Sequence, residues 1–174
     1  LGVESFSCGY LINDEEKVEW KIWLTNPGEP FFKEYWTIPY IADHNLQARY
    51  KSWENQEEFH CAVLEGEENL AHHLIISKYA PWKEEMQDDL PSQLVFNSAH
   101  FSLGHLLVIS PEKLSTEIEQ AMVRFAGVFD LTYRRFLDLE KTEAQNRQLE
   151  KIFNENQRLL HSILPEQIAE QIRK

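Results

Sequence analysis

Apolar side chains recur at every second position from Val18 to Leu24. Two sets of side chains point to opposite sides of this stretch: Val18, Trp20, Ile22 and Leu24 on one, and Glu19, Lys21 and Trp23 on the other. This period of two predicts a β-strand with one buried face. A second strand is expected over residues 6–12, joined to the first by a turn at residues 13–16. Trp23 lies on the face opposite Trp20, so it requires an interface, a pocket or a covering helix.

Further elements follow from pattern and turn chemistry. We expect a short helix over residues 46–53, a strand over 59–64 and a helix-prone acidic run as far as His73. Residues 94–102 and 105–110 predict a hairpin around Leu103 and Gly104. Ser115 suits a helix N-cap, because acidic residues occupy the first turn that follows. Helical spacing then predicts one face on the sheet, formed by Ile118, Met122, Phe125 and Phe129.

The composition changes near residue 138, beyond which residues 139–164 contain neither Pro nor Gly. Apolar positions there recur at alternating spacings of three and four, which is typical of a left-handed parallel coiled coil. The expected seam is Leu139, Thr142, Asn146, Leu149, Phe153, Asn156, Leu160 and Ile163. A second register through Leu149, Ile152, Asn156, Leu159 and Ile163 is nearly as good, so a small rotation would exchange one for the other. The alternative is a lone helix that packs on its own domain.

Pro165 interrupts this helix, because proline lacks the amide hydrogen and constrains the residue before it. Residues 159–174 resemble the transducing element that precedes the catalytic domain of class III nucleotide cyclases, where runs of the form LLxxILPxxIAxxL are typical. Leu160 and Ile163 match that pattern, as do the transducer residues Leu164, Pro165, Ile168 and Ala169, and Ile172 continues their apolar stripe. Without the resemblance, composition alone favours a frayed helical tail.

Residues 101–110 and 124–129 resemble the terminal strands and following helix of GAF domains, and residues 131–139 are similar to a GAF exit helix. The resemblance implies an α+β fold, a GAF-like antiparallel sheet flanked by helices, with the first helix of the family missing. It further implies a sensor domain over residues 1–137, a coiled-coil linker over 138–164 and the start of a cyclase transducer helix over 165–174. Residues 29–79 show no clear family pattern.

Composition limits the classes of partner. A formal net charge of −12 opposes binding to nucleic acid or to an anionic membrane. No apolar run approaches the roughly 20 residues that cross a bilayer. The two cysteines, Cys8 and Cys61, form neither a zinc spacing nor a disulfide framework, which favours a reduced, cytoplasmic setting.

The chain shows no catalytic motif, so no catalytic or metal-binding residue is predicted in this segment. Mg or Mn with ATP or GTP is expected only for a catalytic domain beyond Lys174. His161 lacks the pattern of a kinase phosphoacceptor, and the pairs His72–His73 and His60–Cys61 lack the partners of a metal site. One group of aromatic residues either lines a small-molecule pocket or forms core and dimer contacts: Trp20, Trp23, Tyr35, Trp36, Tyr40, Trp53 and Trp82. Burial energy favours the core.

These features predict a homodimeric sensory segment that relays a signal through its coiled coil to a class III adenylate or guanylate cyclase domain. A small molecule in the GAF-like pocket is the candidate stimulus, although the sequence does not identify it. Two alternatives remain: an input domain of a histidine kinase or phosphatase, and a dimerisation scaffold that senses nothing.

Overall fold

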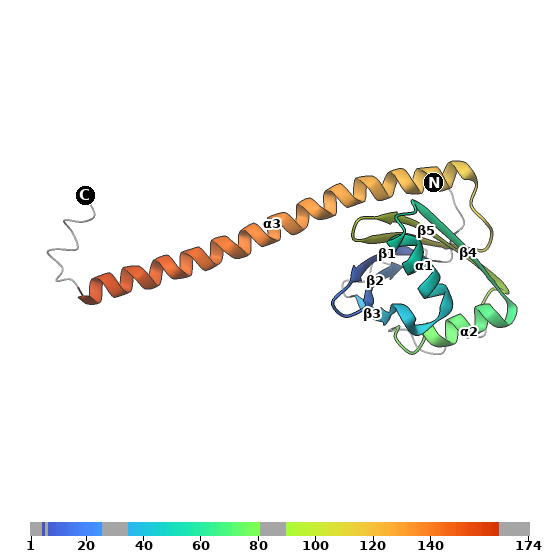
Figure 1. Cartoon of the computed structure of the whole chain (residues 1–174), viewed down its shortest axis with the longest axis horizontal. Helices are drawn as coiled ribbons and strands as arrows, with labels where there is room; N and C mark the ends of the chain where they lie inside the picture. Colours follow the sequence, from blue (N-terminus) through green and yellow to red (C-terminus); the bar gives the residue numbers. More distant parts are fainter. Residues whose placement is uncertain (1–4, 6, 26–34, 81–89, 164–174) are drawn as a thin grey trace. The chain divides into compact units, whose positions relative to one another are not determined.

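The computed structural model describes residues 5, 7–25, 35–80 and 90–163. Within these residues, six strands form one antiparallel sheet in the order β3–β2–β1–β6–β5–β4 (Figure 1). The strands are β1 (Ser7–Asp14), β2 (Glu19–Thr25), β3 (Trp36–Pro39), β4 (Phe59–Glu65), β5 (Gln93–Phe101) and β6 (Gly104–Ser110). The helices are the 3-10 turn η1 (Tyr40–Ala42), α1 (His44–Glu54), α2 (Gly66–Ile76) and α3 (Thr116–Ile163). The α+β class with a long C-terminal helix is therefore confirmed.

The first predicted strand pair is confirmed, but its turn lies two residues later than expected. Asn13 and Asp14 belong to β1, where they pair with Trp20 and Glu19 of β2. The carboxylate of Asp14 accepts a hydrogen bond from the backbone N–H of Lys17 at 3.3 Å and forms an ion pair with Lys21 at 2.9 Å. These contacts hold Asp14 at the end of the strand, so the turn follows it.

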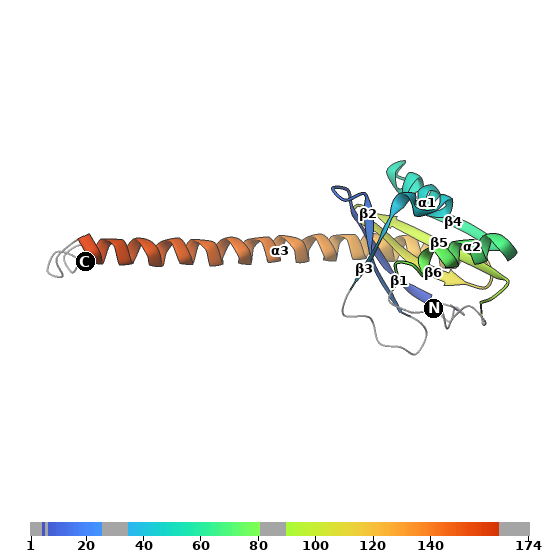
Figure 2. The same ribbon diagram turned by 90° about the horizontal axis from the view of Figure 1, so that it is seen from below.

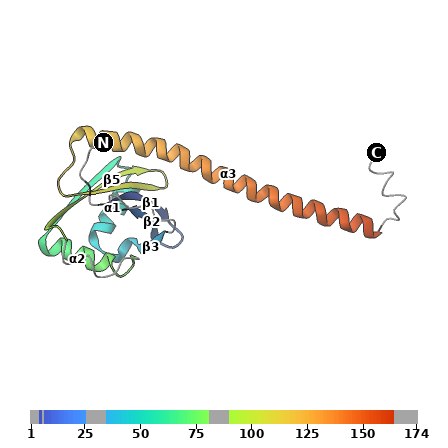
Figure 3. The same ribbon diagram turned by 180° about the vertical axis from the view of Figure 1, so that it is seen from behind.

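Successive side chains of each strand point to opposite faces of the sheet, and the apolar side chains on one of these, the inner face, form the core. Its buried members come from all six strands, from η1 and from α1: Leu11, Trp20, Ile22, Leu24, Trp36, Ile38, Tyr40, Leu46, Leu64, Leu94, Phe96, Leu107 and Ile109. Helices α1 and α2 cover this inner face, as the views from the front, below and behind agree (Figures 1, 2 and 3).

Helix α1 confirms the prediction for residues 46–53 and begins two residues earlier. Asp43 is its N-cap, with an extended backbone and a carboxylate that accepts a hydrogen bond from the backbone N–H of Leu46 at 2.7 Å. An aspartate at this position satisfies a backbone donor that has no partner within the helix. The cap fixes the start of α1 and thereby the direction in which its side chains meet the sheet.

The outer face of the sheet meets the first part of α3. The ring of Phe129 lies 5.1 Å from the ring centroids of both Tyr10 and Phe101, while Met122 and Ala126 of the same helix are buried. The prediction that Phe125 belongs to this face is wrong, because its side chain is 67% exposed. Ala126 is buried instead of Phe125. The buried face of α3 is therefore rotated about the helix axis relative to the face predicted from the spacing that starts at Ile118.

Trp23 is covered on the outer face, as its position on the strand required. Its ring stacks on Tyr10 at 4.8 Å and contacts Tyr35 at 5.0 Å. Because Tyr10 in turn contacts Phe129 of α3, these aromatic side chains connect the outer face to the start of that helix.

The hairpin of β5 and β6 is confirmed, with Gly104 already in β6 and paired with Phe101. The expected start of α3 is also confirmed: the helix begins at Thr116, and Glu117 and Glu119 lie in its first turn. The carbonyl of Ser115 accepts hydrogen bonds from the N–H groups of Ile118 and Glu119. Acidic side chains at this end of a helix are favourable, because they lie near the positive end of its dipole.

The chain divides into two compact units, residues 1–130 and 131–174. The second unit contains the remainder of α3, which continues without interruption to Ile163. The transducer residues Leu164, Pro165, Ile168, Ala169 and Ile172 lie outside the described residues. In the part of the chain that the structure describes, no helix has the length and apolar character needed to span a bilayer.

Candidate functional site

A cavity of about 60 Å³ lies between the inner face of the sheet and helices α1 and α2. Its wall combines apolar side chains of the strands with one arginine and two histidines of the helices: Ser7, Leu11, Ile22, Leu24, Trp36, Leu46, Arg49, His72, His73, Ile76, Phe96, Leu107 and Ile109. An apolar chamber with a few polar groups is the usual form of a small-molecule site. This cavity is the candidate functional site of the first unit.

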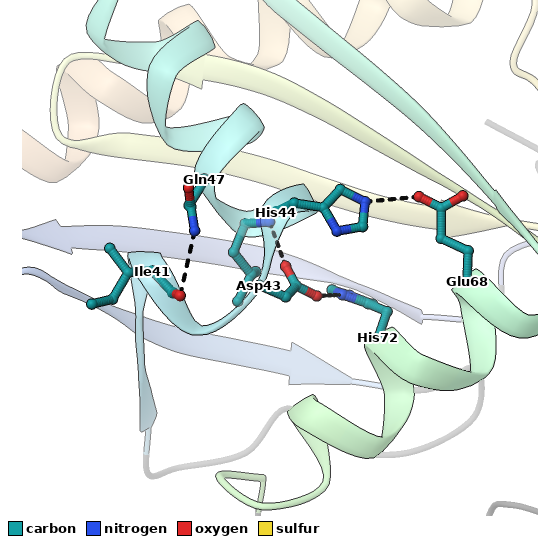
Figure 4. Close-up of polar contacts among 7 residues, drawn as sticks. Ile41, Asp43, His44, Gln47, Glu68 and His72 are labelled. Atoms are coloured by element: carbon teal, nitrogen blue, oxygen red, sulfur yellow. Dashed lines mark hydrogen bonds and ion pairs between the residues drawn. The ribbon is translucent and has the colours of Figure 1, made fainter.

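Two polar contacts connect the helices that cover the cavity (Figure 4). The Nδ1–H group of His72 on α2 donates a hydrogen bond to the carboxylate of Asp43, and both side chains are buried. Near the surface, His44 of α1 lies 2.8 Å from the carboxylate of Glu68 on α2. Asp43 therefore has two roles, as the cap of α1 and as its buried contact with α2.

The protonation state of Asp43 follows from these contacts. Burial alone raises the pKa of its carboxyl, but the hydrogen bond and charge of His72 and the N–H of Leu46 outweigh burial and hold the pKa below its usual value. Asp43 is thus a carboxylate at neutral pH, with one oxygen bound to Leu46 N and the other to His72.

Arg49 is the one guanidinium in the wall of this cavity, and its side chain is almost fully buried, at 2% exposure. It lies over the ring of Trp20, 5.7 Å from the centroid, and over that of Phe96, at 5.4 Å. Its Nε and Nη2 groups have no acceptor among the described residues. Burial lowers the pKa of Arg49 to about 10, against the opposing charge of Asp43, so the guanidinium remains a cation at neutral pH.

Three histidines lie on the inner face near Arg49. Strand register places His60 beside Ser98 and His100 beside His105, and the rings of His100 and His105 are 5.8 Å apart. Burial lowers the pKa of each imidazole, and the positive charge of Arg49 lowers it further. They are therefore neutral at physiological pH, and the charge of Arg49 has no carboxylate hydrogen-bonded to it in this part of the structure.

These neutral histidines predict an acid-sensitive fold. Burial also lowers the pKa of His73, to about 4. Between about pH 6.5 and pH 4 the unfolded chain binds protons that the folded chain does not, so the free energy of unfolding falls as the pH falls. Each such proton contributes a slope of about 1.4 kcal/mol per pH unit. Urea unfolding at pH 7.5, 6.5, 5.5 and 4.5 should show this decline.

The variant His105→Gln removes the deepest of these groups and should give a shallower decline with pH, whatever its effect on stability at pH 7.5. A free energy of unfolding that stays constant from pH 7 to pH 5 would show that these rings are not neutral in the folded protein.

The aromatic residues singled out in the sequence separate into three groups. Trp20, Trp36 and Tyr40 are buried in the core, and Trp36 also lines the cavity. Trp23 and Tyr35 belong to the outer face, whereas the indole N–H of Trp53 donates to the carbonyl of Phe101 at 2.9 Å. Trp82 lies outside the described residues. The interpretation of these residues mainly as core therefore holds for those on the inner face.

The histidine and cysteine pairs are separated by the fold. Cys61 is exposed, whereas His60 is partly buried on the inner face. His72 is bound to Asp43, and its neighbour His73 lines the cavity. Within the described ranges, no group of three or more metal-ligating side chains is assembled.

Large apolar side chains of the expected seam are exposed in the single chain. The exposed fractions are 56% for Leu139, 63% for Leu149 and Phe153 and 49% for Leu160. Asn146 and Asn156 are also exposed, and the side chain of Ile163 is not among those described.

Comparison with protein-family models, curated proteins and solved structures finds no match to this chain.

Sequence reasoning missed the most informative residue of the cavity. Arg49 follows Leu46 by three positions and precedes Trp53 by four, so it lies on the apolar side of the predicted helix. An arginine at such a position is a signal for a buried cation. The partnership of Asp43 with His72 spans 29 residues and requires the tertiary structure.

Proposed function

We propose that this chain is the regulatory segment of a signalling enzyme, in which a GAF-like ligand-binding domain controls the pairing of two α3 helices. The observation that carries the proposal is the exposure of Leu139, Leu149, Phe153 and Leu160 at coiled-coil spacing. Apolar side chains repeated along one helix over this length require a partner surface. A second copy of the chain offers an identical one.

The ligand-binding part of the proposal rests on the cavity and on the order of the elements. The order of the elements includes the two first strands, the middle helices, the strand hairpin and the long exit helix that the resemblance to GAF domains implies, together with β3 and β4. The cavity is enclosed by α1 and α2, which the Asp43–His72 contact holds together. A ligand that favours one arrangement of these helices shifts the population of the domain toward it.

Heptad counting places two further apolar residues on the seam side of α3, beyond the polar positions Thr132 and Arg135. Counting back from Leu139 at position a assigns Phe125 to a and Val128 to d. Both belong to the first unit and are well exposed, at 67% and 64%. Because the side chain of Phe125 is exposed and does not pack on the sheet, it can contact the α3 helix of a second chain.

The domain that this segment is proposed to control is a class III nucleotide cyclase. It would act on ATP or GTP, would require Mg or Mn, and would belong to a cytoplasmic enzyme. The support is the resemblance of residues 159–174 to the cyclase transducing element. Such enzymes place their active sites between two catalytic domains, so a change in helix pairing can alter activity. An exchange between the two registers would supply that change.

An output assay tests the relay. Residues 1–174 are fused directly before a class III cyclase catalytic domain, and the rate of cyclic nucleotide formation is measured. Asn146→Leu adds an apolar residue to the first register alone, and should shift the rate by about fivefold or more, since coupling energies of 1–3 kcal/mol are typical. Ala144→Leu, outside both registers, is the matched control and should leave the rate unchanged.

Both variants should remain dimers in the same assay buffer. A change in the rate of cyclic nucleotide formation then reflects a change of coiled-coil register and not a loss of the dimer. Equal rates for the unaltered fusion and Asn146→Leu would contradict the relay.

A further inference from the structure

Arg49 is a buried cation, and part of its hydrogen-bonding capacity is unused within the described residues. Its side chain is 2% exposed, and Nε and Nη2 have no acceptor among the described residues. Removing a guanidinium from water without a partner is costly, so buried arginines in proteins normally bind a carboxylate or a phosphate. The missing acceptor points to a ligand.

The nearest candidate within the protein does not fill this role. The oxygens of Asp43 accept from the N–H of Leu46 and from His72, and neither accepts from Nε or Nη2 of Arg49. Asp43 acts on Arg49 only through its charge. The guanidinium lies over the rings of Trp20 and Phe96 and lines the cavity. Its Nε and Nη2 groups, which have no acceptor among the residues that the structure describes, can therefore donate to a bound molecule.

The rest of the cavity wall defines the other part of the ligand. Around the guanidinium the strands contribute apolar side chains, among them Leu11, Ile22, Leu24 and Leu107. Among the other polar wall residues, Ser7 donates its hydroxyl to the carbonyl of Thr25 and His72 donates Nδ1–H to Asp43. A fully polar anion such as nitrate or phosphate would therefore leave oxygens against a mostly apolar wall. The volume of about 60 Å³ is also well below the 150 Å³ or so of a cavity that holds benzene.

We propose that this cavity binds a short-chain carboxylate of the size of acetate or propionate, with its carboxylate on the guanidinium of Arg49 and its alkyl group against the apolar wall. The planar fork of arginine donates two parallel hydrogen bonds to a carboxylate, and charge assistance makes them strong. The assignment rests on the proposed function of this domain as a ligand-binding sensor, and it names the stimulus.

Isothermal titration calorimetry of the full chain in a carboxylate-free buffer tests the assignment. Sodium acetate and sodium propionate should bind with a saturable 1:1 stoichiometry, and acetamide, the neutral analogue of acetate, should not. Arg49→Met removes the charge at similar length and should weaken binding by about 100-fold or more. Arg124→Met, which alters an exposed arginine on α3, should bind as the unaltered protein does.

A second variant tests the cavity without touching the arginine. Leu24→Phe fills part of the chamber and should also abolish binding while leaving the guanidinium in place. Arg49→Met should fold at least as stably as the unaltered protein without ligand, because it removes a buried charge that has no bound partner.

Several outcomes would overturn the assignment: no binding of either carboxylate, tighter binding of nitrate or phosphate, or binding that persists in Arg49→Met. The relay is tested separately by adding acetate to the cyclase fusion. Carboxylate binding with no change in cyclic nucleotide formation would leave the ligand assigned and refute its proposed regulatory role.

Discussion

Replacing Leu149 by Glu should separate the paired chains into monomers. Leu149 is shared by both candidate registers, so neither can avoid the substitution by rotating. Each chain loses a seam leucine, whose burial contributes about 1.5–3 kcal/mol, and gains a carboxylate directed at its copy in the partner. The dissociation constant should rise by about 100-fold or more, since each 1.4 kcal/mol is tenfold. Sedimentation velocity over a concentration series measures it.

The matched control is Asn154→Glu, which adds the same charge five residues further along the helix, at a position outside both registers. Asn154 is exposed, and its variant should sediment as the unaltered protein does. An unchanged dissociation constant for Leu149→Glu would place the contact between chains elsewhere.

Replacing Gly9 by Ala should destabilise the first unit severely. Gly9 lies in the middle of β1, paired with Leu24 on one side and Leu107 on the other. A Cβ atom there would lie 1.9 Å from the carbonyl oxygen of Trp23 and 2.9 Å from Cα of Leu24. Both neighbours are backbone atoms of β2, so the strands must move apart. We expect a loss of about 3–5 kcal/mol in the free energy of unfolding, measured with urea.

Gly127→Ala makes the same chemical change where the structure offers open space. A Cβ at Gly127 meets no atom within 4 Å, and the residue lies within α3. Alanine is the better helix former by about 1 kcal/mol, so this variant should gain stability. Equal effects of the two substitutions would contradict the close approach of β1 and β2.

Alternation and turn chemistry were sufficient to predict most of the elements that border the cavity. The strand around Trp20 and Ile22, the helix after Asn45 and the hairpin at Leu103 each show a local pattern that the tertiary structure retains. The first turn was misplaced because the contacts of Asp14 with Lys17 and Lys21 depend on the pairing of β1 with β2. Phe125 was misplaced because helical spacing alone does not determine which of two adjacent apolar stripes meets a sheet.

The cavity could not be predicted from the sequence. Its wall combines residues from β1, β2, β3, β5 and β6 with residues from two helices, and their meeting depends on the strand order. Arg49 appears in the sequence as an ordinary helix residue, and only its burial beside Trp20 and Phe96 distinguishes it. Asp43 and His72 likewise acquire their roles from the contact between α1 and α2.

The proposed function depends on parallel, in-register pairing of α3, and interchain cross-linking tests that pairing most directly. With Cys8 and Cys61 both replaced by Ser, Asn156→Cys places a thiol at a position common to both registers. Asn154→Cys places one on the outward side of the same helix. Under mild oxidation, Asn156→Cys should form a covalent dimer of twice 20.6 kDa, and Asn154→Cys should stay largely single-chain. Failure of Asn156→Cys to cross-link, or equal cross-linking of both variants, would contradict the pairing on which the proposed function rests.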